Sequence, residues 1–138
     1  MTTYVKVKYR VDGVHCFKEA FGSHSYLRYK HRHTFHIMLK VEVFHNNREI
    51  EFFALKNEIK ELFAHTFEEV NGFLEFGESS CEDLAKWLLE RFDRKYSITR
   101  RRKLVVSVSE DGDNEAEVDN LDLFPPEQEI QITSKDNW

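Results

Sequence analysis

The sequence predicts an α+β domain in which two helices cover one face of an antiparallel four-stranded sheet. Three observations predict it: apolar and polar residues alternate near the N-terminus, two later segments repeat apolar residues every three or four positions, and alternation then returns. With 138 residues, of which 41% are hydrophobic, the chain can bury a core of this kind. We expect one domain over residues 1–138.

Composition excludes several classes of protein. Charged residues make up 33% of the chain and there are only 5 Gly and 2 Pro, which is unlike collagen or a disordered chain. The net charge of −5 argues against a nucleic-acid partner. No apolar run approaches the ~20 residues of a membrane helix, the first residues lack a signal-peptide pattern, and two cysteines give no disulfide framework. We therefore expect a cytoplasmic protein with no membrane partner.

The first strands are predicted by alternation. Apolar residues alternate with charged ones over 5–12 and with polar ones over 35–43, so each segment is expected to be a half-buried strand. Residues 13–30 have no clear period and are expected to be irregular. Turn-forming residues at 45–48 precede 49–52, which we expect to return as a hairpin strand.

Helical spacing follows. Residues 54–68 have the pattern of an amphipathic helix, and Asn71-Gly72 is a plausible break after it. Ser79 and Glu82 have the spacing of a capping box, so a second helix is expected to begin there. Its predicted buried stripe is Leu84, Ala85, Leu88, Leu89 and Phe92.

The C-terminal third is expected to complete the sheet. Residues 104–110 are predicted to form a strand, and so are residues 129–133. Between them, the carboxylates of 111–122 are expected to lie in a solvated acidic loop that extends to residue 126. A sheet of this kind leaves open edges, and we expect a homo-oligomer because association would close them.

Three histidines form the candidate metal site. His31 and His33 lie two positions apart on a strand, so both project to the side of Phe35. His15 has the same parity as the apolar residues of the first strand, provided that the strand continues through Gly13. Three neutral imidazoles at the rim of a core would hold a transition metal, typically Zn²⁺ with one open coordination position. The alternative is that these are ordinary structural histidines.

Two further side chains are candidate functional groups. Glu110 ends an apolar strand face, where a carboxylate needs a partner such as the paired N–H donors of a pterin or guanine. The alternative is that the strand has ended and Glu110 begins the acidic loop. His65, late in the first helix, is a candidate proton carrier or a residue that stabilises the helix dipole. Residues 100–103 either bind phosphate or form a solvated basic surface.

These motifs together resemble the 6-pyruvoyl-tetrahydropterin synthase / 6-carboxytetrahydropterin synthase family of the tunnelling fold, over about residues 5–118. The resemblance rests on His15 after the first strand, His31-Arg32-His33 at the start of the second, and Ser109-Glu110 at the end of a late strand. Further motifs agree in order and spacing: Ile50-Glu51-Phe52 with Leu55-Lys56, Ala64-His65 with Asn71, and Ser80-Cys81-Glu82-Asp83-Leu84-Ala85-Lys86-Trp87.

The resemblance implies a site and an assembly. His15, His31 and His33 would bind zinc, and Glu110 would hold the pterin. The substrate would be dihydroneopterin triphosphate, whose side-chain hydroxyls reach the zinc while triphosphate is eliminated or the side chain is cleaved. Subunits would close their sheets into a barrel as trimers, usually stacked into hexamers, with the sites at subunit interfaces.

Three positions depart from the family pattern. Leu27 stands where the family has a catalytic cysteine, Ala64 replaces the aspartate of the Asp-His pair, and Arg32 replaces a glycine. A positioned acid–base group contributes ~10²–10⁴-fold in rate, so both losses matter. Three functions stay open: a zinc-dependent lyase in which His65 or a zinc-bound water replaces the lost groups, a non-catalytic pterin-, purine- or nucleotide-binding protein, and an oligomeric scaffold.

Overall fold

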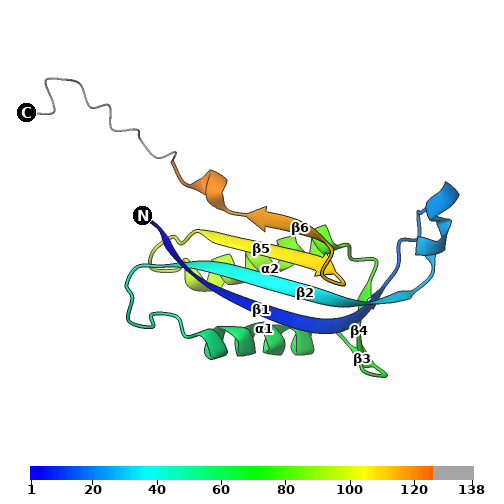
Figure 1. The fold of residues 1–138 in the computed structure, drawn as a ribbon, viewed down its shortest axis with the longest axis horizontal. Coiled ribbons are helices and arrows are strands. Elements are labelled where there is room, and N and C mark those ends of the chain that lie inside the picture. Colours follow the sequence, from blue (N-terminus) through cyan, green and yellow to red (C-terminus); the bar gives the residue numbers. More distant parts are fainter. Residues whose placement is uncertain (126–138) are drawn as a thin grey trace, which may run out of the picture.

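The computed structural model describes residues 1–125 and contains one sheet with helices on one side (Figure 1). Within these residues, no helix is both long enough and apolar enough to span a membrane. The elements follow in the order β1 (Thr3–His15), η1 (Gly22–Arg28), β2 (His31–Val43), α1 (Phe52–Thr66), β3 (Glu69–Val70), β4 (Phe73–Gly77), α2 (Cys81–Tyr96), β5 (Leu104–Glu110), β6 (Asn114–Asp119) and η2 (Leu121–Leu123).

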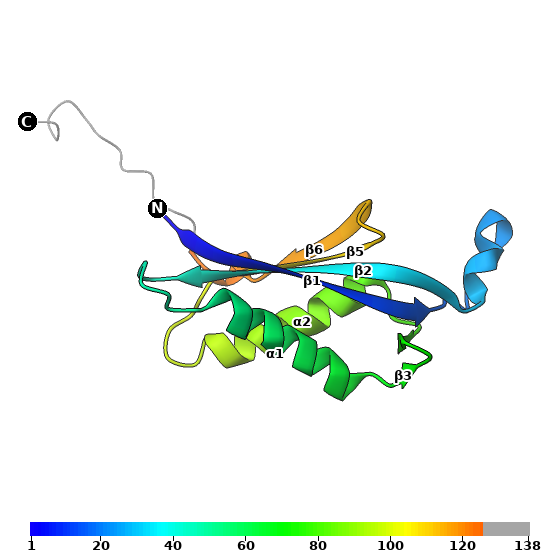
Figure 2. The same cartoon turned by 60° about the horizontal axis from the view of Figure 1, so that its bottom comes forward.

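The sheet has the strand order β3-β4-β1-β2-β5-β6. The pairs β1–β2, β2–β5, β5–β6 and β3–β4 are antiparallel, whereas β4 runs parallel to β1 and pairs with it only at Gly13–His15. Figure 2 shows α1 and α2 together beneath one face of the sheet. The predicted α+β fold is therefore confirmed, and the short hairpin β3–β4, which the sequence did not predict, extends the sheet to six strands.

The core lies between the central strands and the two helices. From β2, four apolar side chains are at most 1% exposed: Phe35, Ile37, Leu39 and Val41. The helices bury their apolar faces against them, as their periodicity predicts. The buried helix residues are Leu55, Ile59, Phe63, Leu84, Ala85, Leu88 and Phe92.

Side-chain caps fix where the helices begin. Glu51 caps α1 by accepting from the backbone N–H groups of Phe53 and Ala54 at 2.9 and 2.8 Å. In α2 the capping box joins Ser80 and Asp83 through two 3.1 Å hydrogen bonds, one residue later than predicted.

The expected hairpin strand at 49–52 is wrong. Strand β2 ends at Val43, and no strand returns before α1 within this part of the chain. Glu49 instead accepts from the backbone N–H of Phe44 at 2.6 Å and from the Arg102 guanidinium at 2.6 Å. These bonds hold 44–51 as an irregular connection into the helix.

The acidic loop predicted for 111–126 is also wrong in part, because residues 114–119 form strand β6. Glu115, Glu117 and Asp119 alternate there with Ala116 and Val118. An edge strand tolerates charges on its open face, which hid the strand in an acidic composition. In the N-terminal part, β1 continues to His15 rather than ending at residue 12. The predicted strand at 129–133 lies outside the described residues.

Candidate metal centre and ligand pocket

Three histidines from β1 and β2 converge at one end of the sheet. One ring nitrogen from each of His15, His31 and His33 lies within 4.8 Å of the other two. The ring centroids are 4.5 to 5.5 Å apart, and the Phe35 ring lies 5.1 Å from that of His15. The structure thus brings together the cluster that alternation predicts, while its role as a metal site stays a prediction.

The pairing register of β1 and β2 produces this convergence. His15 lies directly opposite His31, and Gly13 lies opposite His33, so all three side chains share the face that carries the core. A Cβ atom at Gly13 would lie 2.2 Å from Cε2 of Phe76. The glycine therefore lets an aromatic side chain pack directly beneath the cluster.

Each imidazole is oriented by a hydrogen bond at Nδ1. In every ring Nδ1 faces an oxygen that can only accept, so Nδ1 donates and Nε2 is the ring nitrogen left for a metal. The acceptors are the Ser79 carbonyl for His15 at 2.9 Å, the Tyr29 carbonyl for His31 at 2.9 Å and the Asp111 carboxylate for His33 at 2.7 Å.

The donor set fits a small divalent cation. Nε2 of His15 has no hydrogen-bond partner among the described residues, and the side chain is only 9% exposed. Oε1 of Glu110 lies 3.0 Å from this nitrogen without hydrogen-bond geometry. Burial lowers the pKa of His15 and so favours its neutral form. A lone pair facing a carboxylate is unfavourable unless a positive charge lies nearby, and three imidazole nitrogens are typical zinc ligands.

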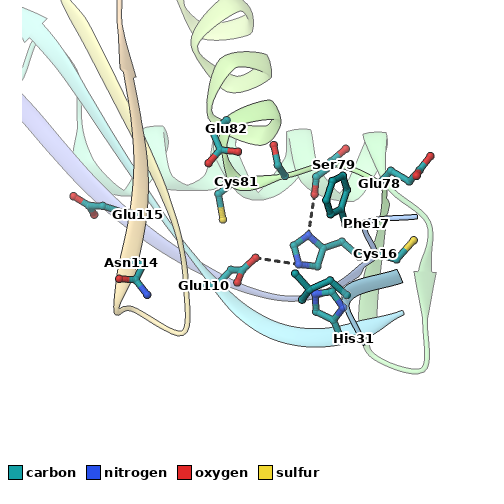
Figure 3. A pocket seen from close by; sticks show the side chains of 13 residues that line it. Cys16, Phe17, His31, Glu78, Ser79, Cys81, Glu82, Glu110, Asn114 and Glu115 are labelled. Carbon is teal, nitrogen blue, oxygen red and sulfur yellow. Dashed lines mark hydrogen bonds and ion pairs between the residues drawn. The ribbon is translucent and has the colours of Figure 1, made fainter. Parts of the chain in front are cut away.

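Glu110 belongs to the site and not to a loop. It is the last residue of β5 and pairs across the sheet with Phe35, so it lies on the core side as its parity predicts. Its second oxygen is 3.5 Å from Nε2 of His33. In Figure 3 a dashed line joins Glu110 to the imidazole that also contacts Ser79, which is the 3.0 Å contact with His15.

A pocket of about 330 Å³ opens beside the cluster. This volume lies at the small end of the ~300–1,000 Å³ that is usual for ligand sites. Its apolar walls include Phe17 and Leu27, and the beginning of α2 forms another wall (Figure 3). The lining residues are His15, Cys16, Phe17, Leu27, His31, Glu78, Ser79, Ser80, Cys81, Glu82, Glu110, Asn114 and Glu115.

The cysteines of the pocket are poor nucleophiles. Burial, together with the negative charge of the neighbouring Glu110, raises the pKa of Cys81 to about 12. Its thiol is therefore protonated at neutral pH, although it lies in the first turn of a helix. Cys16 follows His15 on the chain and is buried. In Figure 3 its sulfur points away from the cluster.

His65 is not brought into this pocket by its own chain. Its side chain is 80% exposed at the end of α1, where Nε2 lies 3.4 Å from a carboxylate oxygen of Glu61. Arg32, between two of the clustered histidines, projects to the opposite face and stacks 4.4 Å from the Phe73 ring centroid.

The predicted basic run at 100–103 contains two side chains that contact the rest of the fold, Arg100 and Arg102. Arg102 donates to the Glu42 carbonyl at 3.0 Å and to the Glu49 carboxylate at 2.6 Å. Arg100 stacks on Phe44, with its guanidinium carbon 3.5 Å from the ring centroid. Because these groups are engaged with the fold, they do not form an open phosphate site.

Asp111 is a site residue that the sequence analysis missed. It occupies the left-handed region (φ 56°) in the turn between β5 and β6. Its carboxylate accepts from His33 Nδ1–H at 2.7 Å and from the backbone N–H of Thr34 at 3.1 Å. The hydrogen bond from His33 lowers the pKa of Asp111. The only sequence signal was the turn-forming pair Asp111-Gly112 after a strand.

Comparison with solved structures identifies proteins that share this fold. The 6-pyruvoyltetrahydropterin synthase of Plasmodium falciparum superposes with a TM-score of 0.58 at 18% identity, over 86% of this chain and 98% of that one. The Plasmodium vivax enzyme gives 0.57 at 17% identity, and a catalytic-residue mutant of it gives 0.59 at 17%, each over 87% of this chain and 98% of the other. No protein-family model and no curated protein sequence matches the chain. The protein thus has the fold of these synthases, as the motif resemblance predicted.

Proposed function

We propose that the protein binds zinc through His15, His31 and His33 and holds a pterin or purine-like ligand against Glu110, with the proton-transfer chemistry of the synthases weakened or lost. One observation carries this proposal: three imidazoles, each hydrogen-bonded through Nδ1 to an acceptor oxygen, converge beside a carboxylate in a pocket. In a protein that served only as a scaffold, a buried ring nitrogen without a hydrogen-bond partner would destabilise the fold without benefit.

Each part of the pocket supports one part of such a ligand. The two oxygens of Glu110 match the paired N–H donors on the edge of a pterin or guanine. Phe17 and Leu27 supply apolar surface against which a flat ring can pack. When bound, zinc would act as a Lewis acid with one coordination position open to a ligand oxygen.

The proton-transfer groups of the family pattern are missing from the pocket. Leu27, at the position of the family's cysteine, lines the pocket but has no titratable group. Cys81 keeps its proton because of its raised pKa. His65 lies outside the pocket of its own chain. A binding protein is therefore the function that these side chains support best.

A lyase is the second candidate, and one contact favours it. Glu61 lies 3.4 Å from His65 and could orient the imidazole in place of the family's aspartate. The pair is exposed at the end of α1, where it is free to face the pocket of a neighbouring subunit in an oligomer. Dihydroneopterin triphosphate is the substrate that this candidate function requires.

We propose that the assembly is a homo-oligomer, a trimer or hexamer, closed through the sheet edges. Among residues 1–125, the segment 3–12 of β1 pairs only with β2 and β6 pairs only with β5, so each has one open side within this part of the chain. The two edge strands are antiparallel to one another within the sheet, so pairing β6 with the β1 of a rotated copy continues the antiparallel order.

Charge on the two edges favours that pairing. On the sheet face opposite the helices, β1 carries Lys6, Lys8 and Arg10, whereas β6 carries Glu115, Glu117 and Asp119. We expect Lys8→Glu to lower the oligomeric state measured by light scattering, and Glu117→Lys in the same chain to restore it partly. A monomeric wild-type protein would contradict the proposed assembly.

Metal analysis and ligand binding test the site itself. We expect stoichiometric zinc in the purified protein, and we expect His33→Ala to lose metal and ligand together. His24→Ala is the matched control because His24 is an exposed histidine outside the cluster. Leu27→Cys should leave binding intact. Full zinc occupancy in His33→Ala would show that the ligand assignment is wrong.

Incubation with dihydroneopterin triphosphate separates the two candidate functions. Mass spectrometry would detect an unchanged ligand for a binding protein and zinc-dependent turnover for a lyase. Loss of that turnover in both His65→Ala and Glu61→Gln would support the lyase.

A further inference from the structure

The pocket beside the histidine cluster carries negative charge without positive side chains. Among its lining residues there are four glutamates, and there is no lysine or arginine. Glu110 reaches into the pocket, Glu82 lies on the first turn of α2 and Glu78 lies at the rim, whereas the side chain of Glu115 points away from the pocket (Figure 3). The three carboxylates at the pocket outnumber the two charges of a bound divalent cation, so this surface would keep a net negative charge.

Two basic side chains that are close to the clustered histidines in sequence face elsewhere. Lys30 forms an ion pair with Glu75 at 2.8 Å, and Arg32 stacks on Phe73. Both line a separate hollow against β4 that shares no residue with the histidine pocket. Lys30 and Arg32 therefore flank His31 in sequence, but their side chains line the hollow against β4 and not the histidine pocket.

The helix that borders the pocket carries negative charge at its N-terminus. Free backbone N–H groups at a helix N-terminus commonly bind phosphate. In α2, the capping box uses the N–H group of Asp83, which leaves those of Cys81 and Glu82 in the first turn. Glu82 and Asp83 place two carboxylates in the same turn, so an anion bound there would meet like charges.

A second, independent observation shows that the pocket is built for a ligand. Nε2 of His15 lies on the pocket wall, unpartnered, in a side chain that is only 9% exposed. It needs a cation, and that cation needs a further donor atom from the pocket. The remaining polar surface, centred on Glu110, accepts hydrogen bonds and donates few.

We propose that the natural ligand of this pocket is an uncharged or cationic nitrogen heterocycle, with an N–H edge toward Glu110, and that the acidic pocket selects against its phosphorylated forms. This rests on the proposed binding function and restricts its ligand class. A ligand phosphate beside these carboxylates would meet like charges, and no lysine or arginine from residues 1–125 of the same chain lines the pocket to offset them. This preference for unphosphorylated ligands would distinguish the protein from an enzyme whose substrate is a triphosphate ester.

The test compares two probes on the zinc-loaded protein by calorimetry. The probes are neopterin, whose side chain is uncharged, and neopterin monophosphate, which carries the same ring. We expect about tenfold weaker binding of the phosphate at low ionic strength, with the difference shrinking in about 1 M salt, where the Debye length is ~3 Å. The double variant Glu78→Gln/Glu82→Gln should strengthen binding of the phosphate and leave neopterin nearly unchanged. Glu90→Gln, an exposed site on α2 outside the pocket, is the control for net charge.

The possible outcomes distinguish a failure of this inference from a failure of the proposed binding function. Equal or tighter binding of the phosphate would overturn the inference while leaving pterin binding in place. The inference would also be overturned if the double variant and Glu90→Gln had equal effects on the affinities for neopterin and for neopterin monophosphate. Binding of neither probe, with zinc still bound, would overturn the pterin proposal and this inference together.

Discussion

Replacing Asp111 with asparagine should weaken zinc binding without unfolding the turn. Asparagine tolerates the left-handed conformation of this position (φ 56°) and can still accept from the Thr34 N–H. It removes the charge-assisted hydrogen bond to Nδ1 of His33, which is 2.7 Å long. Bonds of this kind contribute ~1.5–3 kcal/mol, and ~1.4 kcal/mol corresponds to a factor of ten. We therefore expect zinc affinity to fall about 10- to 100-fold.

Competition with a chromogenic zinc chelator at neutral pH measures this loss. Asp113→Asn is the matched control, since it removes the same charge from the same turn and its side chain has no partner within residues 1–125. Unchanged affinity in Asp111→Asn would refute the argument that this carboxylate orients His33. An equal loss in both variants would mean that general electrostatics, and not the hydrogen bond, sets the affinity.

Three further predictions concern the pocket, the core and acid stability. Glu110→Gln should keep zinc and lose the ligand, as metal analysis and calorimetry on one sample would show. Gly13→Ala should destabilise the fold by ~1–3 kcal/mol in urea unfolding, because the added methyl would meet Phe76. The hydrogen bond from Arg102 lowers the pKa of Glu49 from 4.5 to about 2, so its contribution to stability is present above pH 4.5 and is lost as the pH falls toward 2. Glu49→Gln should flatten thermal stability across that range.

For each of these three predictions, one result would contradict the reasoning behind it. Loss of zinc in Glu110→Gln would make the carboxylate part of the metal site rather than of the ligand site. A Gly13→Ala protein as stable as wild type would show that Phe76 has room to move. An unchanged acid profile in Glu49→Gln would assign the acid sensitivity to other carboxylates.

The histidine cluster was predictable because strand alternation has a period of two. Given that His31, His33 and Phe35 share one strand, their side chains must share one face, and the register then sets His15 opposite His31. The side of Glu110 followed from the same rule. What alternation could not give was distance across the sheet, since the order of strands decides which residues meet.

The parts that were missed depend on contacts between distant segments. Asp111 reaches His33 only because β5 pairs with β2, and the two residues are 78 positions apart. Glu49 is tied to Arg102 across 53 positions, which is why a local strand pattern at 49–52 was misleading. Strand β6 was hidden for a different reason: charges on an edge strand look like a solvated loop in a single sequence.

Zinc-dependent stability separates a scaffold from a binding protein more directly than any activity measurement. A buried ring nitrogen without a partner costs ~1–3 kcal/mol, so in a pure scaffold His15 would weaken the fold and added zinc would leave the unfolding temperature unchanged. If the cluster binds zinc in the native state alone, stability rises with concentration, by ~2.7 kcal/mol at one hundred times the dissociation constant. The rise should disappear in His33→Ala and persist in His24→Ala. Stabilisation of both variants alike would place the zinc elsewhere, and the site described here would lose its main support.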